Sequence, residues 1–188
     1  MSGAYRAREV CMSVESAQAE ARRLRQDVWG DRLPVDPKEL GFLLMMPFRD
    51  TLIPIHFETA DLHGASGMAM LDTNHPEGPR FLCVANRGEP HYRSRFTMAH
   101  ELGHVVLGHV TEESPSWRDE DFKLARSQPG YSHYEEERDA NAFAAELLMP
   151  EEGIRPMLDL GLTLSGMADR FGVSPTAMNW RLINLGIT

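Results

Sequence analysis

The chain has 188 residues, of which 42% are hydrophobic, and it carries a formal net charge of −9 at pH 7. This length supports one sizeable hydrophobic core with room for a small appendage. The negative charge argues against a general affinity for nucleic acid, and no stretch is apolar enough to span a membrane. The start of the chain lacks the apolar segment of a secretory signal. With two cysteines, Cys11 and Cys83, the sequence predicts no disulfide framework and a cytoplasmic setting.

The first part of the chain is predicted to be helical after a flexible tail at residues 1–12. A helix can begin at either Ser13 or Ser16, because both side chains can cap it, and it runs to Trp29. The pair Asp36–Pro37 combines a capping residue with a proline suited to the first helical turn, and it starts a second, short helix.

Strands are predicted in the next part of the chain, at residues 45–49, 53–58, 66–71 and 80–85. The turn signals between them favour an antiparallel arrangement in sequence order. The last segment, residues 80–85, is nearest in sequence to the helix that follows. It is either an edge strand that can pair with an extended substrate or an ordinary interior strand.

The stretch at residues 95–110, RFTMAHELGHVVLGHV, contains His100, Glu101 and His104 in an HExxH pattern. On a helix, the two histidines lie one turn apart on one face and can bind one zinc ion, with Glu101 placed to activate a water molecule. The helix is otherwise almost entirely apolar, which predicts burial, and a metal would satisfy its polar groups. In the alternative interpretation, these side chains simply bond to protein neighbours. We expect a zincin-like α+β domain at residues 13–150, with a small antiparallel sheet packed on this helix.

A catalytic zinc site needs a third protein ligand and keeps its fourth position for water. His109 is a poor candidate, because five residues along a helix turn it about 140° away from His104. Four further histidines have no partner at ligand spacing and are predicted not to bind metal: His56, His63, His75 and His91.

A polar connection at residues 111–133 contains two prolines and a glycine and shows no clear period. It predicts a loop that borders the site. Tyr131, His133 and Tyr134 stand at its end, and one of them could donate a hydrogen bond to the oxyanion formed during peptide hydrolysis. The alternative is that they are surface aromatic residues at the start of a helix.

The segment at residues 135–150, EEERDANAFAAELLMP, predicts a second helix with one buried face. Glu136 and Glu137 both extend that face toward the start of the helix, so either could be the third ligand. Periodicity does not choose between them. Either acid could instead be exposed in the first turn, where the helix dipole favours negative charge.

The C-terminal segment, residues 151–188, is predicted to be helical and to contain a helix-turn-helix-like unit. The phrase MADRFGVSPTAMNWRL is similar to the DNA-reading units of regulators, with Asn179, Arg181 and Asn184 on its second helix. However, the segment holds three arginines and four acidic residues, whereas a DNA reader needs a positive surface. We therefore expect packing or partner docking here rather than binding to nucleic acid.

Taken as a pair, RFTMAHELGHVVLGH and ERDANAFAAELLMP resemble the ImmA/IrrE family of metallo-endopeptidases, over a region from about residue 35 to the C-terminus. In that family the third ligand is the first Glu of an ExxAN or ExxAD pattern followed by FA and LLMP. The resemblance therefore implies Glu137 rather than Glu136. It also implies that Asn141 occupies a position that orients a ligating histidine in related zinc peptidases, where Asp is common.

The resemblance implies a zinc-dependent endopeptidase in which His100, His104 and Glu137 bind Zn²⁺ and Glu101 is the general base. Relatives cleave a helix-turn-helix repressor, so the expected partner is a protein substrate, encoded nearby, rather than a membrane or a nucleic acid. Two alternatives remain: a DNA-binding regulator with a structural zinc, and a toxin–antitoxin component that acts through binding. A regulator would bind DNA whether or not Glu101 is intact, whereas a peptidase would lose activity without it.

Overall fold

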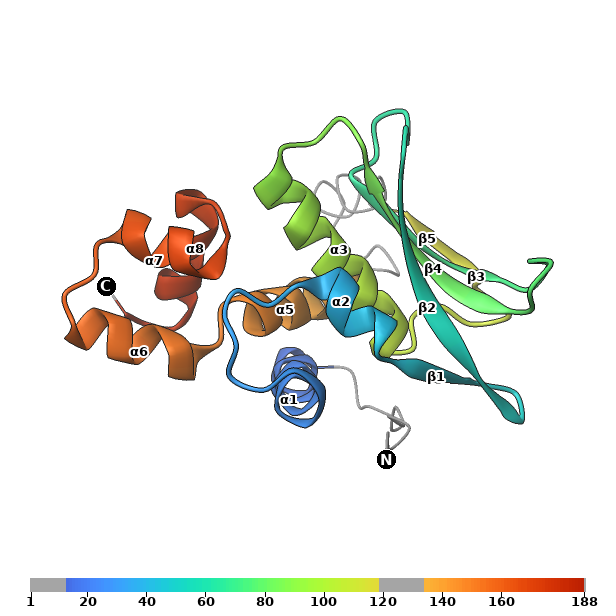
Figure 1. The fold of residues 1–188 in the computed structure, drawn as a ribbon, viewed down its shortest axis with the longest axis horizontal. Coiled ribbons are helices and arrows are strands. Elements are labelled where there is room, and N and C mark those ends of the chain that lie inside the picture. Colours follow the sequence, from blue (N-terminus) through green and yellow to red (C-terminus); the bar gives the residue numbers. More distant parts are fainter. Residues whose placement is uncertain (1–12, 119–133, 188) are drawn as a thin grey trace.

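The computed structural model describes residues 13–118 and 134–187, and Figure 1 shows how its helices and sheet are arranged. The predicted tail at residues 1–12 lies outside the described residues, as do Tyr131 and His133. Among the helices that are described, none has the length and apolar character needed to cross a bilayer.

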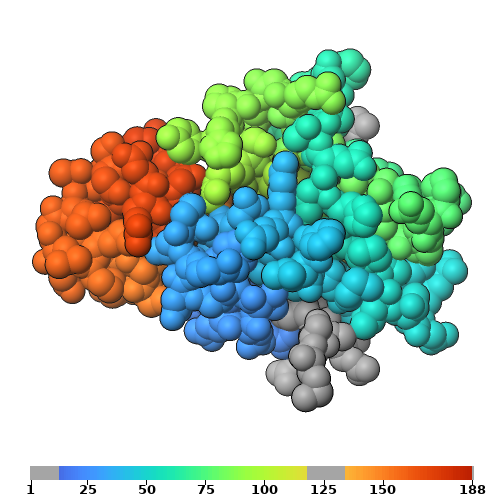
Figure 2. Space-filling model, in the orientation of Figure 1, coloured from blue at the N-terminus to red at the C-terminus, as the bar shows by residue number. Residues whose placement is uncertain are grey.

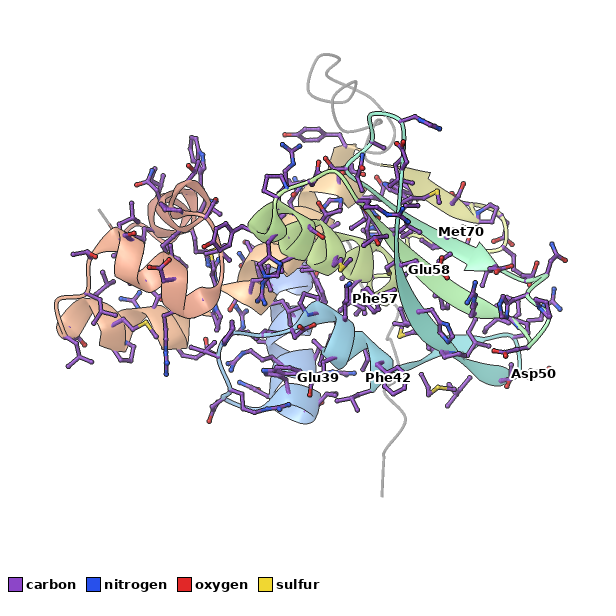
Figure 3. The ribbon with its side chains drawn as sticks, turned by 45° about the horizontal axis from the view of Figure 1, so that its top comes forward. Glu39, Phe42, Asp50, Phe57, Glu58 and Met70 are labelled. Atoms are coloured by element: carbon purple, nitrogen blue, oxygen red, sulfur yellow. The ribbon has the colours of Figure 1, made fainter. Side chains whose placement is uncertain are left out.

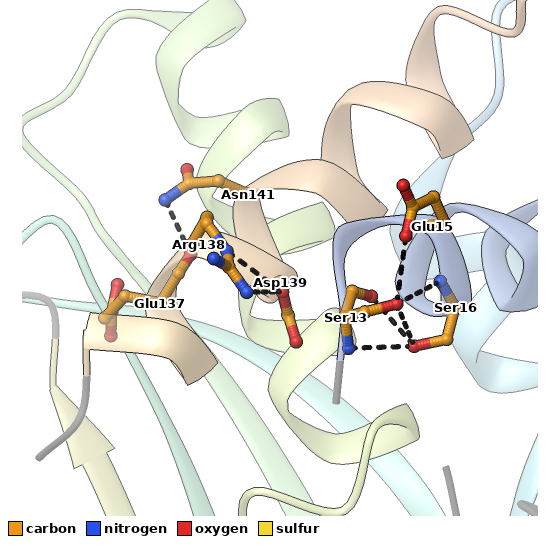
Figure 4. Close-up of polar contacts among 7 residues, drawn as sticks. All are labelled: Ser13, Glu15, Ser16, Glu137, Arg138, Asp139 and Asn141. Carbon is orange, nitrogen blue, oxygen red and sulfur yellow. Dashed lines mark hydrogen bonds and ion pairs between the residues drawn. The ribbon is translucent and has the colours of Figure 1, made fainter. Parts of the chain in front are cut away.

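The N-terminal helix is fixed by a local capping arrangement. Helix α1 (Val14–Leu24) begins after Ser13, whose hydroxyl accepts a hydrogen bond from the backbone N–H of Ser16. The Ser16 hydroxyl in turn accepts from the backbone N–H of Ser13, which completes a capping box (Figure 4). The predicted helix is confirmed, but its last turn widens into a π-helix, η1 (Arg25–Trp29).

The short helix α2 (Pro37–Phe42) is confirmed as well, and the Asp36 carboxylate caps it by accepting two backbone N–H bonds. This helix lies directly on the sheet. A Cβ at Gly41 would come within 2.2 Å of the Phe57 ring, so the glycine permits the close approach visible beside the labelled Phe57 in Figure 3.

Within residues 13–118 and 134–187, five strands form one sheet: β1 (Met45–Phe48), β2 (Thr51–Ala60), β3 (Gly67–Asp72), β4 (Arg80–Asn86) and β5 (Ser116–Arg118). Their spatial order is β1-β2-β4-β3-β5. Strand β2 pairs with β4 in parallel, and the other neighbouring pairs are antiparallel.

This order confirms the α+β class but corrects the predicted sheet, which is mixed rather than purely antiparallel. Of the two alternatives left open for residues 80–85, the structure shows the interior strand, because β4 lies between β2 and β3. Alternation along a strand shows which face a side chain takes, but it does not identify the neighbouring strand. The sequence did carry a signal for an interior position, because the five residues from Phe81 to Ala85 are all apolar. A continuous apolar run is typical of a central strand, and the structure buries all five.

Strand β5 lies within the stretch that was predicted to be an irregular loop. It pairs with β3, which places Trp117 opposite Ala69. Three residues are too few to show a period of two, so the sequence pattern does not predict this strand.

The two long helices cross at Gly103. Helix α3 (His91–Val106) and helix α5 (Tyr134–Leu148) confirm the two predicted helices. A Cβ at Gly103 would lie 3.0 Å from the Phe143 ring and 3.3 Å from the Ala140 carbonyl oxygen. The absence of a side chain there lets α5 lie close against the helix that carries the histidines.

The C-terminal helices are α6 (Glu151–Asp159), α7 (Leu164–Phe171) and α8 (Pro175–Asn184). The predicted helix-turn-helix-like unit is present, because Gly172 ends α7 in a left-handed conformation and Ser174 caps α8. These helices form one end of the molecule in Figure 2. Their apolar side chains join the same hydrophobic core as α1, α3 and α5.

Candidate metal centre

Three buried side chains from α3 and α5 converge on one point. His100 and His104 face each other with their Nε2 atoms 3.0 Å apart. Glu137 approaches both, with Oε2 lying 3.3 Å from His100 Nε2 and Oε1 lying 3.4 Å from His104 Nε2. One donor atom from each residue lies within 4.8 Å of the other two. The structure thus brings together the three residues predicted as ligands.

Glu137 rather than Glu136 occupies this position. The Glu137 side chain is fully buried, whereas Glu136 is half-buried at the next position along α5. Burial by itself raises the pKa of the Glu137 carboxyl group. Hydrogen bonds from His100 and His104, together with their charges, outweigh burial and hold that pKa below its usual value. A metal cation between the three side chains would favour the same ionised form of the carboxyl group.

The prediction that His109 points away from His104 is wrong, because α3 ends at Val106 and the loop that follows returns His109 to the site. Helix α3 ends in a Schellman motif in which Gly108 has a φ of 77°. The backbone N–H of His109 bonds to the His104 carbonyl at 2.9 Å, and that of Gly108 bonds to the Val105 carbonyl at 3.2 Å. As a result, His109 Nδ1 lies 2.9 Å from His104 Nδ1. The signal for this turn was Gly108, because a glycine commonly stops a helix one residue beyond its C-cap.

His109 and the other histidines in the described part of the chain are not part of the group formed by His100, His104 and Glu137. The contact of His109 is with the ring nitrogen of His104 that faces away from the site. Burial, followed by the neighbouring His104 and His100, lowers the pKa of His109 to about 3. The ring is therefore neutral at physiological pH and can accept a hydrogen bond.

Trp117 of β5 is a further residue at the site that the sequence analysis missed. Its indole N–H donates to Glu137 Oε1 at 2.5 Å. The same indole ring lies against the His104 ring, with centroids 5.0 Å apart and an angle of 30° between the planes. A single side chain from the sheet therefore contacts one candidate ligand on each helix.

Asn141 contacts Glu137 rather than a histidine. Its side-chain amide donates to the backbone carbonyl of Glu137 at 2.8 Å (Figure 4). This bond lies within α5, one turn beyond the candidate ligand. The expected contact on a ligating histidine is made instead by His109.

Glu101 is buried beside the histidines and faces the sheet. A Cβ on Gly67, at the start of β3, would lie 2.2 Å from Glu101 Oε1, so the carboxylate occupies the space that a side chain would fill. Cys83 of β4 lies nearby, and its thiol pKa is raised well above the usual value by burial and by the charge of Glu101. The thiol is therefore protonated and unsuited to act as a nucleophile.

The residues present fit a divalent metal. Two imidazole nitrogens and one carboxylate oxygen form the donor set of a catalytic zinc site with an open fourth position. When both imidazoles are neutral, as metal ligands must be, the Glu137 carboxylate is a buried charge, and a cation between the three side chains would offset it. His100, His104 and Glu137 are the residues that would hold the ion.

One helix carries two histidines and packs on a curled sheet, and a second helix crosses it and adds a glutamate. This is the arrangement of the zincin-like metallopeptidases. Comparison with known families supports this class. The family model described as the IrrE N-terminal-like domain of the M78 peptidases matches residues 53–182. The chain belongs to this family of metallopeptidases.

Comparison with solved structures shows a likeness in fold at low sequence identity. A solved structure described as a Mycobacterium tuberculosis transcriptional regulator is similar in fold, with a TM-score of 0.53 and 18% sequence identity. The similarity covers 89% of this chain and 46% of that one, so this chain spans about half the length of the regulator. Comparison with curated proteins yields no match.

Proposed function

We propose that this protein is a zinc-dependent endopeptidase. The observation that carries the proposal is the convergence of His100, His104 and Glu137 to within 4.8 Å of one another, with Glu101 buried next to His100 on the same helix. Membership of a metallopeptidase family supports the same reaction.

Glu101 is the general base in this proposal. Zinc bound by the three ligands supplies a Lewis acid that polarises the scissile carbonyl and makes water more acidic. Glu101 accepts a proton from the attacking water and delivers it to the leaving amine as the carbon–nitrogen bond breaks. Of the three proposed donors to the oxyanion, Tyr134 is within the described residues. It is the first residue of α5 and is 46% exposed, three positions before Glu137.

The substrate we propose is a protein, and the leading candidate is a helix-turn-helix repressor encoded nearby, whose cleavage would relieve repression. The support for this choice is the resemblance of the two sequence motifs to the ImmA/IrrE endopeptidases. Their family model also covers both helices of the site and most of the C-terminal segment.

The second candidate function is a DNA-binding regulator with a structural zinc, and the observation in its favour is the α7–α8 unit. Its charges disfavour that role. The Arg181 guanidinium is buried, pairs with Glu146 and donates to the Met149 carbonyl, so it supports packing. Arg155 pairs with Glu151. Arg181 is therefore engaged within the protein rather than presented to phosphates, and the exposed Arg155 is offset by its acidic neighbour.

The experiment that tests the peptidase compares three glutamates in one preparation series. Glu101→Gln should keep zinc and thermal stability while lowering cleavage by about 10²- to 10⁴-fold, the usual contribution of a general base. Glu137→Gln should lower zinc affinity and, with it, stability, because metal binding is linked to folding. Glu136→Gln is the matched control on α5 and should resemble the unchanged protein.

Zinc content, melting temperature and the cleavage rate of the neighbouring repressor are measured on each variant. Loss of zinc by Glu101→Gln, with retention by Glu137→Gln, would show that the roles are assigned wrongly. If Glu136→Gln behaves as expected for Glu137→Gln, the third ligand has been placed one residue off.

A further inference from the structure

Trp117 joins the sheet to both helices of the metal centre. It is 6% exposed and lies on β5, where pairing with β3 holds its backbone. The indole N–H bonds to Glu137 Oε1, and the indole ring lies against the His104 ring. A side chain with these two contacts restricts the rotation of Glu137 and His104 at the same time.

His109 contacts the Nδ1 atom of His104, on the side of the ring that faces away from the other two candidate ligands. The Nε2 atom of His104 faces His100 and Glu137, so metal binding requires the lone pair on that nitrogen. The proton of a neutral His104 must then be on Nδ1, where it can be donated to His109 Nδ1 at 2.9 Å. This contact selects the tautomer of His104 that can bind metal.

We propose that Trp117 and His109 are positioning residues of the metal centre. The indole N–H of Trp117 is hydrogen-bonded to Oε1 of Glu137, so that Glu137 binds the metal through its other oxygen alone. His109 holds His104 in its Nδ1-protonated form. This inference rests on the proposed function, because it assumes that the three residues bind a metal.

One-oxygen binding by Glu137 matters because it limits the number of protein donors to three. If both carboxylate oxygens bound the metal, they would fill a position that water or a substrate carbonyl needs. The indole N–H, held at 2.5 Å from Oε1, competes with the metal for that oxygen. Contacts of this kind around metal ligands typically change metal affinity or activity by about 10- to 100-fold.

The first test substitutes Trp117→Phe, which retains an aromatic ring beside His104 and removes the N–H donor. Trp29→Phe is the matched control, because Trp29 is also 6% exposed and donates its indole N–H to the Arg32 carbonyl at 2.9 Å. Both proteins are loaded with Co²⁺, whose visible absorption weakens as its coordination number rises.

We expect Trp117→Phe to bind Co²⁺ with a weaker and shifted visible band, because the second oxygen of Glu137 becomes free to bind. Trp29→Phe should leave the spectrum unchanged while losing a similar amount of stability in the metal-free state. Identical spectra for Trp117→Phe and the unchanged protein would overturn the role of Trp117.

The second test compares His109→Leu with His109→Asn by zinc competition against a chromophoric chelator. Leu removes the acceptor, and we expect zinc affinity to fall by about 10- to 100-fold. The Asn side-chain oxygen can replace Nδ1 as an acceptor, so His109→Asn should recover most of that loss. Equal affinities for the two variants would show that His109 contributes packing alone.

The outcomes separate this inference from the proposed function. An unchanged protein that binds neither Zn²⁺ nor Co²⁺ would overturn both. A protein that binds metal and shows the expected variant effects, but cleaves no repressor, would support the positioning roles and contradict the peptidase.

Discussion

Replacement of Gly67 by alanine tests where the Glu101 carboxylate lies. The new Cβ would be 2.2 Å from Glu101 Oε1 and 2.4 Å from Thr97 Cγ2. Gly67 is the first residue of β3, and its φ is outside the left-handed region, so alanine suits the backbone. The conflict is therefore with the two α3 side chains, and the end of a flexible glutamate moves more easily than the strand.

The size of the effect follows from these distances. A Cβ does not approach another heavy atom within 3.0 Å, so Oε1 must retreat by at least about 0.8 Å. A displacement of about 1 Å in a catalytic group can lower the rate about 10²-fold. Overpacking of a buried site costs about 1–3 kcal/mol, which leaves the protein folded at room temperature. Zinc content should not change, because Gly67 does not contact the three ligands.

The assay measures repressor cleavage, zinc content and melting temperature for Gly67→Ala. Gly166→Ala is the control, because a Cβ there would lie 3.4 Å from Thr163 Oγ1, an ordinary contact. We expect Gly166→Ala to keep full activity. If Gly67→Ala kept full cleavage activity, the placement of Glu101 against β3 would be wrong. If it lost zinc as well as activity, the effect would be on the metal centre as a whole.

Three other predictions concern the metal, pH and DNA. The protein should carry about one zinc per chain and His104→Ala should lose it, so a fully metallated His104→Ala would contradict the site. In metal-free protein, the free energy of unfolding should fall as the pH drops from 6.5 toward about 3, because His109 stays neutral in the fold while the unfolded chain takes up a proton. His109 contributes up to about 1.4 kcal/mol of unfolding free energy per pH unit over this range. Denaturant titrations at several pH values should therefore show a weaker pH dependence of that free energy for His109→Asn. An equal pH dependence in both proteins would contradict the assignment. Residues 151–188 hold three arginines against four acidic residues, and Arg181 is buried in a pair with Glu146. They should give no sub-micromolar, salt-sensitive binding to duplex DNA in an anisotropy titration of the full chain, and such binding would revive the regulator.

Some features of this protein were determined by short-range patterns in its sequence. The spacing of His100 and His104 was enough to place both on one helical face, because helix geometry depends on neighbouring residues. The capping residue Asp36 marked a helix start for the same reason, and Ser13 was one of two candidates, since a cap bonds to backbone N–H groups two or three positions away.

The choice of third ligand shows where such patterns end. Periodicity placed Glu136 and Glu137 on the same buried side of α5, and family resemblance was needed to prefer one. The structure buries Glu137 completely, three positions before Ala140, which packs on Gly103 where the helices cross. That crossing depends on the shape of two helices that are separated along the chain, so no local period contains it.

Only the tertiary structure decided the strand order and the surroundings of the metal centre. Strand β4 pairs with its neighbour in sequence, β3, on one side and with the more distant β2 on the other. Trp117 reaches Glu137 only through the pairing of β5 with β3. Contacts of this kind join residues distant in sequence, and their free energy comes from burial and packing between elements rather than from the preference of any single segment.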